Sequence, residues 1–219
     1  MKELLKRTTP KTFAWMAIGV FITGLGNAVL RLSTMGTDPY TSMNLGLANY
    51  IPVSYGTIQA TVGLLFFIPV IICYRHSIGF GTFANMLGLA YISDFLMWVF
   101  KNVGYTPDSL SGNVTARIVL MLLGVLFVAF GLAMYFEADL GVASFDSLAP
   151  MIVMWSKGKI KFFQARVIGD VSCLVIGFLL GAIIGPATVI IAVGLGPMVA
   201  FFRGKLAPFC KSEVANQNV

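Results

Sequence analysis

Long apolar runs separated by short polar stretches divide the 219-residue chain into eight segments. Six of them are long enough to cross a bilayer, whereas the second and the sixth, of about 12 residues, reach only about 18 Å. The segments cover residues 13–33, 41–52, 56–74, 78–100, 116–136, 144–156, 163–183 and 186–202. The pattern predicts an all-α polytopic membrane protein, because a transmembrane barrel would show alternating segments of about ten residues.

The same pattern occurs twice along the chain. A shift of 105 positions, or 106 after one inserted residue, brings identical residues into register. The matches include Met16 on Met121, Gly19 on Gly124, Gly26 on Gly131, Gly36 on Gly141, Ser42 on Ser147, Gln59 on Gln164, Gly79 on Gly185 and Thr82 on Thr188. We therefore expect two tandem repeats of three to four membrane segments each. The expected parts are a cytoplasmic N-terminal tail (1–12), repeat 1 (13–100), a connecting loop (101–115), repeat 2 (116–203) and a cytoplasmic C-terminal tail (204–219).

The two short segments occupy matching places, and each follows a glycine break. The first break reads Gly36-Thr37-Asp38-Pro39-Tyr40-Thr41-Ser42, and the second reads Gly141-Val142-Ala143-Ser144-Phe145-Asp146-Ser147. Short, interrupted segments at matching positions of two halves point to a transporter-like site near the middle of the membrane.

Two roles are open to the polar side chains of these breaks: they cap the free N–H groups of the next helix, or they bind polar groups of a substrate. Gln59 and Gln164 either reach the same site or form interhelical hydrogen bonds worth about 1 kcal/mol each. We expect a central polar pocket, and the candidate substrate-binding residues are Asp38, Thr41, Ser42, Gln59, Asp146, Ser147 and Gln164.

Other polar and small residues have simpler interpretations. Arg166 and Asp170 are four positions apart, which favours a local ion pair over a proton relay. Asp94 has no acidic counterpart in the second half and either lies near the interface or lines a cavity. Two runs of small residues, Gly24-x-Gly26-x-Ala28 and Ala129-x-Gly131-x-Ala133, predict close helix approach.

Positive charges leave two topologies open. If the short segments cross, each half has four crossings and both halves point the same way. If they are re-entrant, each half has three crossings and the halves are inverted, which moves Lys101 and Arg117 to the outer side and Arg75 to the inner side. Both versions place the two termini in the cytoplasm, where basic residues collect.

Composition supports the membrane class and excludes others. The chain is 58% hydrophobic and 11% charged, with a mean hydropathy of +0.87, whereas a soluble domain carries about 25% charged residues. The net charge is +6, and the charged residues lie at the ends of apolar segments, which argues against nucleic-acid binding. A single histidine, His76, and three cysteines provide no metal-ligand spacing or nucleophile motif. We expect no catalytic residue, metal or cofactor, and no enzyme activity.

Several motifs resemble the YczE/YitT-type family of bacterial integral membrane proteins. They are Gly24-x-Gly26-x-Ala28, the two breaks after Gly36 and Gly141, Gly56-Thr57 and Ile78-Gly79-Phe80-Gly81-Thr82. The resemblance covers residues 13–203 and implies a multi-pass protein of the plasma membrane with a role in transport or secondary metabolism. It supplies no catalytic residue. Ala143-Ser144 replaces Asp38-Pro39 in the second half, so a site shared by the halves is only pseudo-symmetric.

Two classes of function remain. The first is a small-molecule transporter or a substrate-binding membrane subunit of an importer, handling a small polar or amphipathic substrate between the repeats. The alternative is a non-transporting scaffold or regulator that binds a partner protein, or a second copy of itself, through small-residue helix faces. Both classes imply contact with the lipid bilayer. A polar cavity between the halves favours the first class, and a dry bundle with an exposed groove favours the second.

Overall fold

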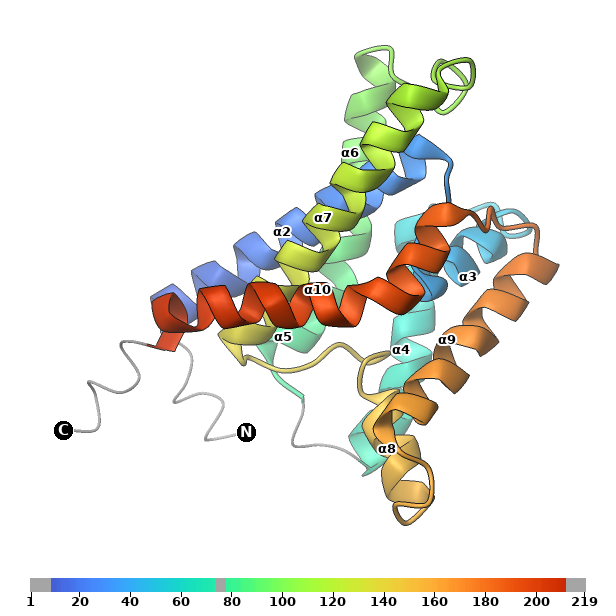
Figure 1. The fold of residues 1–219 in the computed structure, drawn as a ribbon. Coiled ribbons are helices and arrows are strands. Elements are labelled where there is room, and N and C mark those ends of the chain that lie inside the picture. Colours follow the sequence, from blue (N-terminus) through green and yellow to red (C-terminus); the bar gives the residue numbers. More distant parts are fainter. Residues whose placement is uncertain (1–8, 74–77, 212–219) are drawn as a thin grey trace.

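The computed structural model describes residues 9–73 and 78–211, and every regular element among them is helical (Figure 1). Six helical stretches are long and apolar enough to cross a membrane. Five of these are the single helices α2 (Pro10–Ser33), α4 (Tyr55–Cys73), α7 (Val114–Ala138), α9 (Phe162–Leu179) and α10 (Pro186–Lys211). The sixth, Phe80–Asn102, joins α5 (Phe80–Phe83), the π-helical turn η2 (Ala84–Leu89) and α6 (Ala90–Asn102). The all-α, multi-pass prediction is confirmed.

The two short segments form helices that do not span. Helix α3 (Pro39–Ala48) has 10 residues and α8 (Leu148–Trp155) has 8, which correspond to about 15 Å and 12 Å. Three long helical stretches therefore precede the loop at residues 103–113, and three follow it. This loop lies at the top of Figure 1, whereas α8 and its turn into α9 lie at the bottom. Three long stretches on each side of the loop is the number that the three-crossing alternative requires.

Some expected boundaries shift. Helix α10 continues to Lys211, past the end expected at residue 203, and α2 begins at Pro10 because Thr9 caps it: the Thr9 hydroxyl accepts the N–H of Thr12. The outer parts of both expected tails, residues 1–8 and 212–219, lie outside the described residues, as do Arg75 and His76.

Helices α2 and α7 form the centre of the bundle, antiparallel and in very close contact. A Cβ atom added at Gly19 would lie 2.8 Å from the Gly131 carbonyl oxygen, and one added at Gly26 would lie 3.0 Å from the Gly124 oxygen. Only glycine permits such an approach of two backbones. The predicted close packing of the small-residue faces is thereby confirmed, and Ala28, Ala129 and Ala133 are fully buried beside them.

The two glycine breaks share one backbone geometry. Gly36 and Gly141 have φ angles of +95° and +116°, a region that residues with a Cβ rarely adopt. Each break is held by the start of a distant helix. The N–H of Ala187 donates to the Met35 carbonyl at 3.0 Å, and the N–H of Gly81 donates to the Leu140 carbonyl at 2.8 Å. Each half thus fixes the break of the other half.

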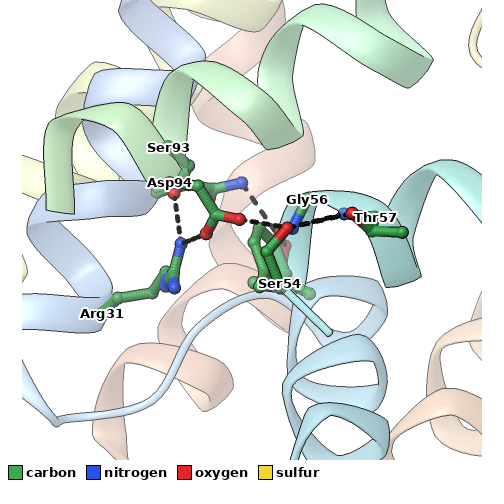
Figure 2. Close-up of polar contacts among 9 residues, drawn as sticks. Arg31, Ser54, Gly56, Thr57, Ser93 and Asp94 are labelled. Carbon is green, nitrogen blue, oxygen red and sulfur yellow. Dashed lines mark hydrogen bonds and ion pairs between the residues drawn. The ribbon is translucent and has the colours of Figure 1, made fainter. Parts of the chain in front are cut away.

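A polar network at one end of the bundle joins α2, α4 and α6 (Figure 2). The Arg31 guanidinium donates to Asp94 at 2.8 Å and to the Ser93 hydroxyl at 3.0 Å. The second Asp94 oxygen accepts the N–H of Gly56 at 2.6 Å, in the first turn of α4. Asp94 does not line the cavity described below; it bonds an arginine and the N–H at a helix start.

Candidate functional site: a cavity between the halves

A cavity of about 630 Å³ lies where α2, α3, η2, α7, α9 and α10 meet. Its walls come from both halves of the chain and are mostly apolar, with a few polar groups from the glycine breaks and the long helices. Volumes of this size accommodate small organic molecules. The π-helical turn contributes Asn85, Met86 and Leu89, and such turns recur at functional sites.

Four of the seven candidate residues line this cavity, namely Asp38, Thr41, Gln59 and Asp146. The other three do not line it. Ser42 and Ser147 are completely buried in local hydrogen bonds, Ser42 with the Thr37 hydroxyl at 2.9 Å and Ser147 with the Ala143 carbonyl at 3.1 Å. The structure therefore brings four of the seven candidates to one cavity and places the other three elsewhere.

Gln164 is the clearest correction. Its side chain is exposed, and its Oε1 accepts the N–H of Lys161 at 2.9 Å, which caps the start of α9. Gln59, its counterpart at the matching position, is only 4% exposed and lines the cavity. The difference arises because Gln164 is the third residue of α9, where it caps the helix start, whereas Gln59 is the fifth residue of α4.

Asp38 takes the first of the two roles that the sequence left open, the capping of a helix, and it also lies on the cavity wall. It is the N-cap of α3, where its Oδ1 accepts the N–H of Thr41 at 3.0 Å, and it also lines the cavity. The Thr41 hydroxyl lies 3.4 Å from the Asn27 amide nitrogen, which donates to it, and 3.2 Å from the Tyr55 hydroxyl. A carboxylate and a hydroxyl of the first break thus face the same space.

Asp146 does not cap a helix, contrary to one of its two interpretations. It forms an ion pair with Arg166 at 2.6 Å, and Arg166 also bonds Asp170 at 3.1 Å. The predicted Arg166–Asp170 pair is thereby confirmed and becomes part of a three-residue cluster on the cavity wall. The Arg166 guanidinium also lies 5.1 Å from the centre of the Phe145 ring.

Aromatic rings contribute much of the remaining wall. Tyr40 of α3 and Phe145 of the second break stack with centroids 4.7 Å apart and planes 17° apart. Both rings line the cavity together with Phe136, Phe162 and Phe163. Such faces attract apolar groups and cations alike.

Sequence reasoning missed several residues of the cavity. Asn27, Asn85 and Thr23 line it although their matching positions are apolar, and Arg203 reaches it from α10. Arg203 is paired with Glu137 at 2.8 Å. For Asn27 and Asn85 the sequence does carry a signal, because an amide inside an apolar membrane segment is costly and points to a function.

Within the part of the chain that the structure describes, three side-chain oxygens of the cavity wall residues are buried and accept no hydrogen bond. They are Asn27 Oδ1, Gln59 Oε1 and Asp170 Oδ1. A buried acceptor without a donor costs about 1–3 kcal/mol, so such groups mark places that a ligand or water completes. Among residues 9–73 and 78–211, no three His, Cys, Asp or Glu side chains are grouped to hold a metal ion.

The helices define a multi-pass membrane protein in contact with the lipid bilayer, and the cavity between its helices is mostly apolar with a few polar groups. The chain belongs to a family of unknown function, DUF6198, whose model matches residues 10–204. An uncharacterized protein of Haemophilus influenzae is 26% identical over 200 residues, covering 90% of this chain and 85% of that protein. The uncharacterized protein YyaS of Bacillus subtilis is 25% identical over 161 residues, covering 71% and 75%. No solved structure matches the chain significantly.

Proposed function

We propose that this chain is a transporter of a small molecule, not an enzyme, and that its two halves are inverted repeats facing each other across the cavity. The observation that carries the proposal is the cavity itself. It is lined by both halves and by residues of the two glycine breaks, and three buried oxygens of its wall residues have no hydrogen-bond partner among the described residues. Broken helices are tolerated in a membrane where they line such a space.

Reciprocal contacts support the inverted repeats. The offset of 105 pairs Gly19 with Gly124 and Gly26 with Gly131. In the structure Gly19 contacts Gly131, and Gly26 contacts Gly124. Replacing each glycine by its counterpart therefore turns the first contact into the second. The hydrogen bonds that hold the two breaks behave in the same way. Met35 corresponds to Leu140 and Gly81 to Ala187, so each bond is the counterpart of the other.

The two halves also differ in a way that suits alternating access. In the first half α4 packs on α5 and η2: the rings of Phe67 and Phe83 are 5.3 Å apart, and a Cβ at Gly63 would lie 2.6 Å from Met86. The positions matching Phe67 and Phe83 are Ser172 on α9 and Val189 on α10, and both side chains are exposed. Inverted repeats that exchange these two arrangements open the cavity to opposite sides of the membrane in turn.

The alternative class, a scaffold acting through small-residue faces, loses its main support. The faces around Gly26 and Gly131 are consumed in the contact between α2 and α7. They are therefore closed to a partner protein unless the central pair of helices separates.

Cysteine cross-linking tests the proposal without knowledge of the substrate. In a chain whose native cysteines are replaced by serine, one variant carries Phe67→Cys with Phe83→Cys and the other carries Ser172→Cys with Val189→Cys. A cycling transporter in membranes cross-links at both pairs with a short bis-maleimide, because each pair closes in one state. Single-cysteine variants provide the background. Cross-linking at the first pair alone would contradict the proposal.

A further inference from the structure

We infer that the cavity binds an organic cation: a molecule with a protonated amine at one end and an apolar body at the other. The inference rests on the proposed function for the cavity's role and adds the chemical class of the substrate.

Three residues of the cavity wall, among those that the structure describes, carry a buried side-chain oxygen that has no hydrogen-bond donor. Gln59 and Asn27 are 4% and 3% exposed, and each has one side-chain oxygen without a donor. Asp170 adds a carboxylate oxygen in the same condition. Oxygens of this kind pair only with N–H or O–H donors, and an ammonium group supplies three such donors.

The charge of the wall has the complementary sign. Asp38, Asp146 and Asp170 contribute three carboxylates to the cavity, and Arg166 is paired with only two of them. The other arginine of the wall, Arg203, is already bound to Glu137 and lies 5.8 Å from the Phe136 ring centre. Each guanidinium group thus has an acidic partner, whereas the Asp38 carboxylate forms no direct ion pair among the described residues, so the wall favours a cationic ligand.

The aromatic pair provides the second half of the recognition. The Tyr40 and Phe145 rings lie on the cavity wall beside Asp38 and Asp146, which neighbour them in the sequence. A flat or aliphatic body packs on these rings, and a cation beside them gains from the negative faces of the π-systems. An amine head and an apolar body therefore match the two kinds of wall.

Three probes that share a phenylethyl body separate the head groups: 2-phenylethylamine, 2-phenylethanol and 3-phenylpropanoate. Their binding to the full-length protein in detergent micelles is measured by equilibrium dialysis. We expect the amine to bind at least tenfold more tightly than the alcohol and the acid. Equal binding of the alcohol or the acid, or no saturable binding of the amine, would overturn the inference.

Variants test the residues. Asp38→Asn retains a good N-cap while it removes the charge, so α3 remains intact and the preference for the amine is lost. Asp170→Asn removes a second negative charge from the wall and is also expected to reduce the preference for the amine. Gln59→Leu is expected to weaken amine binding at least fivefold. Asp108→Asn, in the exposed loop between α6 and α7, is the control and leaves the affinity unchanged. Wild-type preference in both Asp38→Asn and Asp170→Asn contradicts the inference.

Failure of the two proposals is distinguishable. Amine binding without uptake into liposomes contradicts the transporter and leaves the cation site intact. Uptake of the acid in preference to the amine contradicts the cation site and leaves the transporter intact.

Discussion

The rings of Tyr40 and Phe145 stack on each other in the cavity wall, with centroids 4.7 Å apart, although the two residues are separated by 105 positions in the chain. That separation is the offset at which the two halves match. If the halves are inverted repeats, these residues are equivalent, and the axis that relates the halves passes between their rings. A contact between equivalent residues is expected only near such an axis.

Loss of one ring tests the contribution of the stack to binding. Phe145→Leu removes an aromatic contact worth about 0.5–1.5 kcal/mol, so we expect the affinity for 2-phenylethylamine to fall by a factor of about 2–10. Equilibrium dialysis measures the effect. The matched control is Phe178→Leu, whose ring is 68% exposed and lies outside the cavity. Equal affinities for the two variants would contradict the placement of the stack in the site.

Close packing of α2 and α7 predicts a large effect at Gly131. A Cβ there would lie 2.7 Å from the Gly19 carbonyl oxygen, so Gly131→Val forces two backbones apart and destabilises the fold by about 1–3 kcal/mol or more. The midpoint of thermal unfolding in detergent measures the loss. Gly169→Val is the control, because nothing lies within 4 Å of an added Cβ at Gly169. Similar midpoints for the two variants would show that the close approach is absent.

The network around Asp94 predicts a loss of stability that leaves binding unchanged. Asp94→Asn removes the ion pair with Arg31, whose side chain is only 14% exposed, and weakens the bond to the Gly56 N–H. We expect a loss of about 1–3 kcal/mol in the free energy of unfolding, because hydrogen bonds to charged groups contribute that much. Amine affinity stays at the wild-type value, since Asp94 does not line the cavity. An affinity reduced in proportion to stability would contradict this separation.

Topology is tested by labelling from the two sides of the membrane. With three crossings in each half and cytoplasmic termini, the loop at residues 103–113 faces outward and the turn at residues 157–161 faces inward. In a chain whose native cysteines are replaced by serine, a membrane-impermeant maleimide should label Asp108→Cys in intact cells and label Lys159→Cys only after lysis. The reverse result would place the termini outside.

The sequence predicted much of this structure because membrane helices leave a strong local signal. The six long spans, the two short helices and the glycine breaks at Gly36 and Gly141 all follow from hydropathy and turn chemistry, which depend on neighbouring residues. The close helix faces followed from runs of small residues. These features need no knowledge of distant contacts.

The composition of the cavity depended on distant contacts and was only partly predictable. Gln59 and Gln164 match in sequence, yet helix α9 begins so close to Gln164 that its amide caps the helix instead of facing the cavity. The position of Asp146 before a short helix is typical of a cap, but its ion pair with Arg166 of α9, at 2.6 Å, depends on a contact 20 residues away. Asn27 was passed over because its matching position is apolar, although its own helix directs it to the cavity.

The same pair of glutamines offers the most direct test that the cavity is a transport site. Uptake of radiolabelled 2-phenylethylamine into proteoliposomes is compared for the wild type, Gln59→Leu and Gln164→Leu, each reconstituted at equal amounts after size-exclusion chromatography. We predict that Gln59→Leu reduces uptake at least fivefold, because it removes a buried acceptor from the cavity wall, and that Gln164→Leu retains uptake within a factor of two. Wild-type uptake by Gln59→Leu, or equal losses in both variants, would contradict the assignment of the cavity as the transport site.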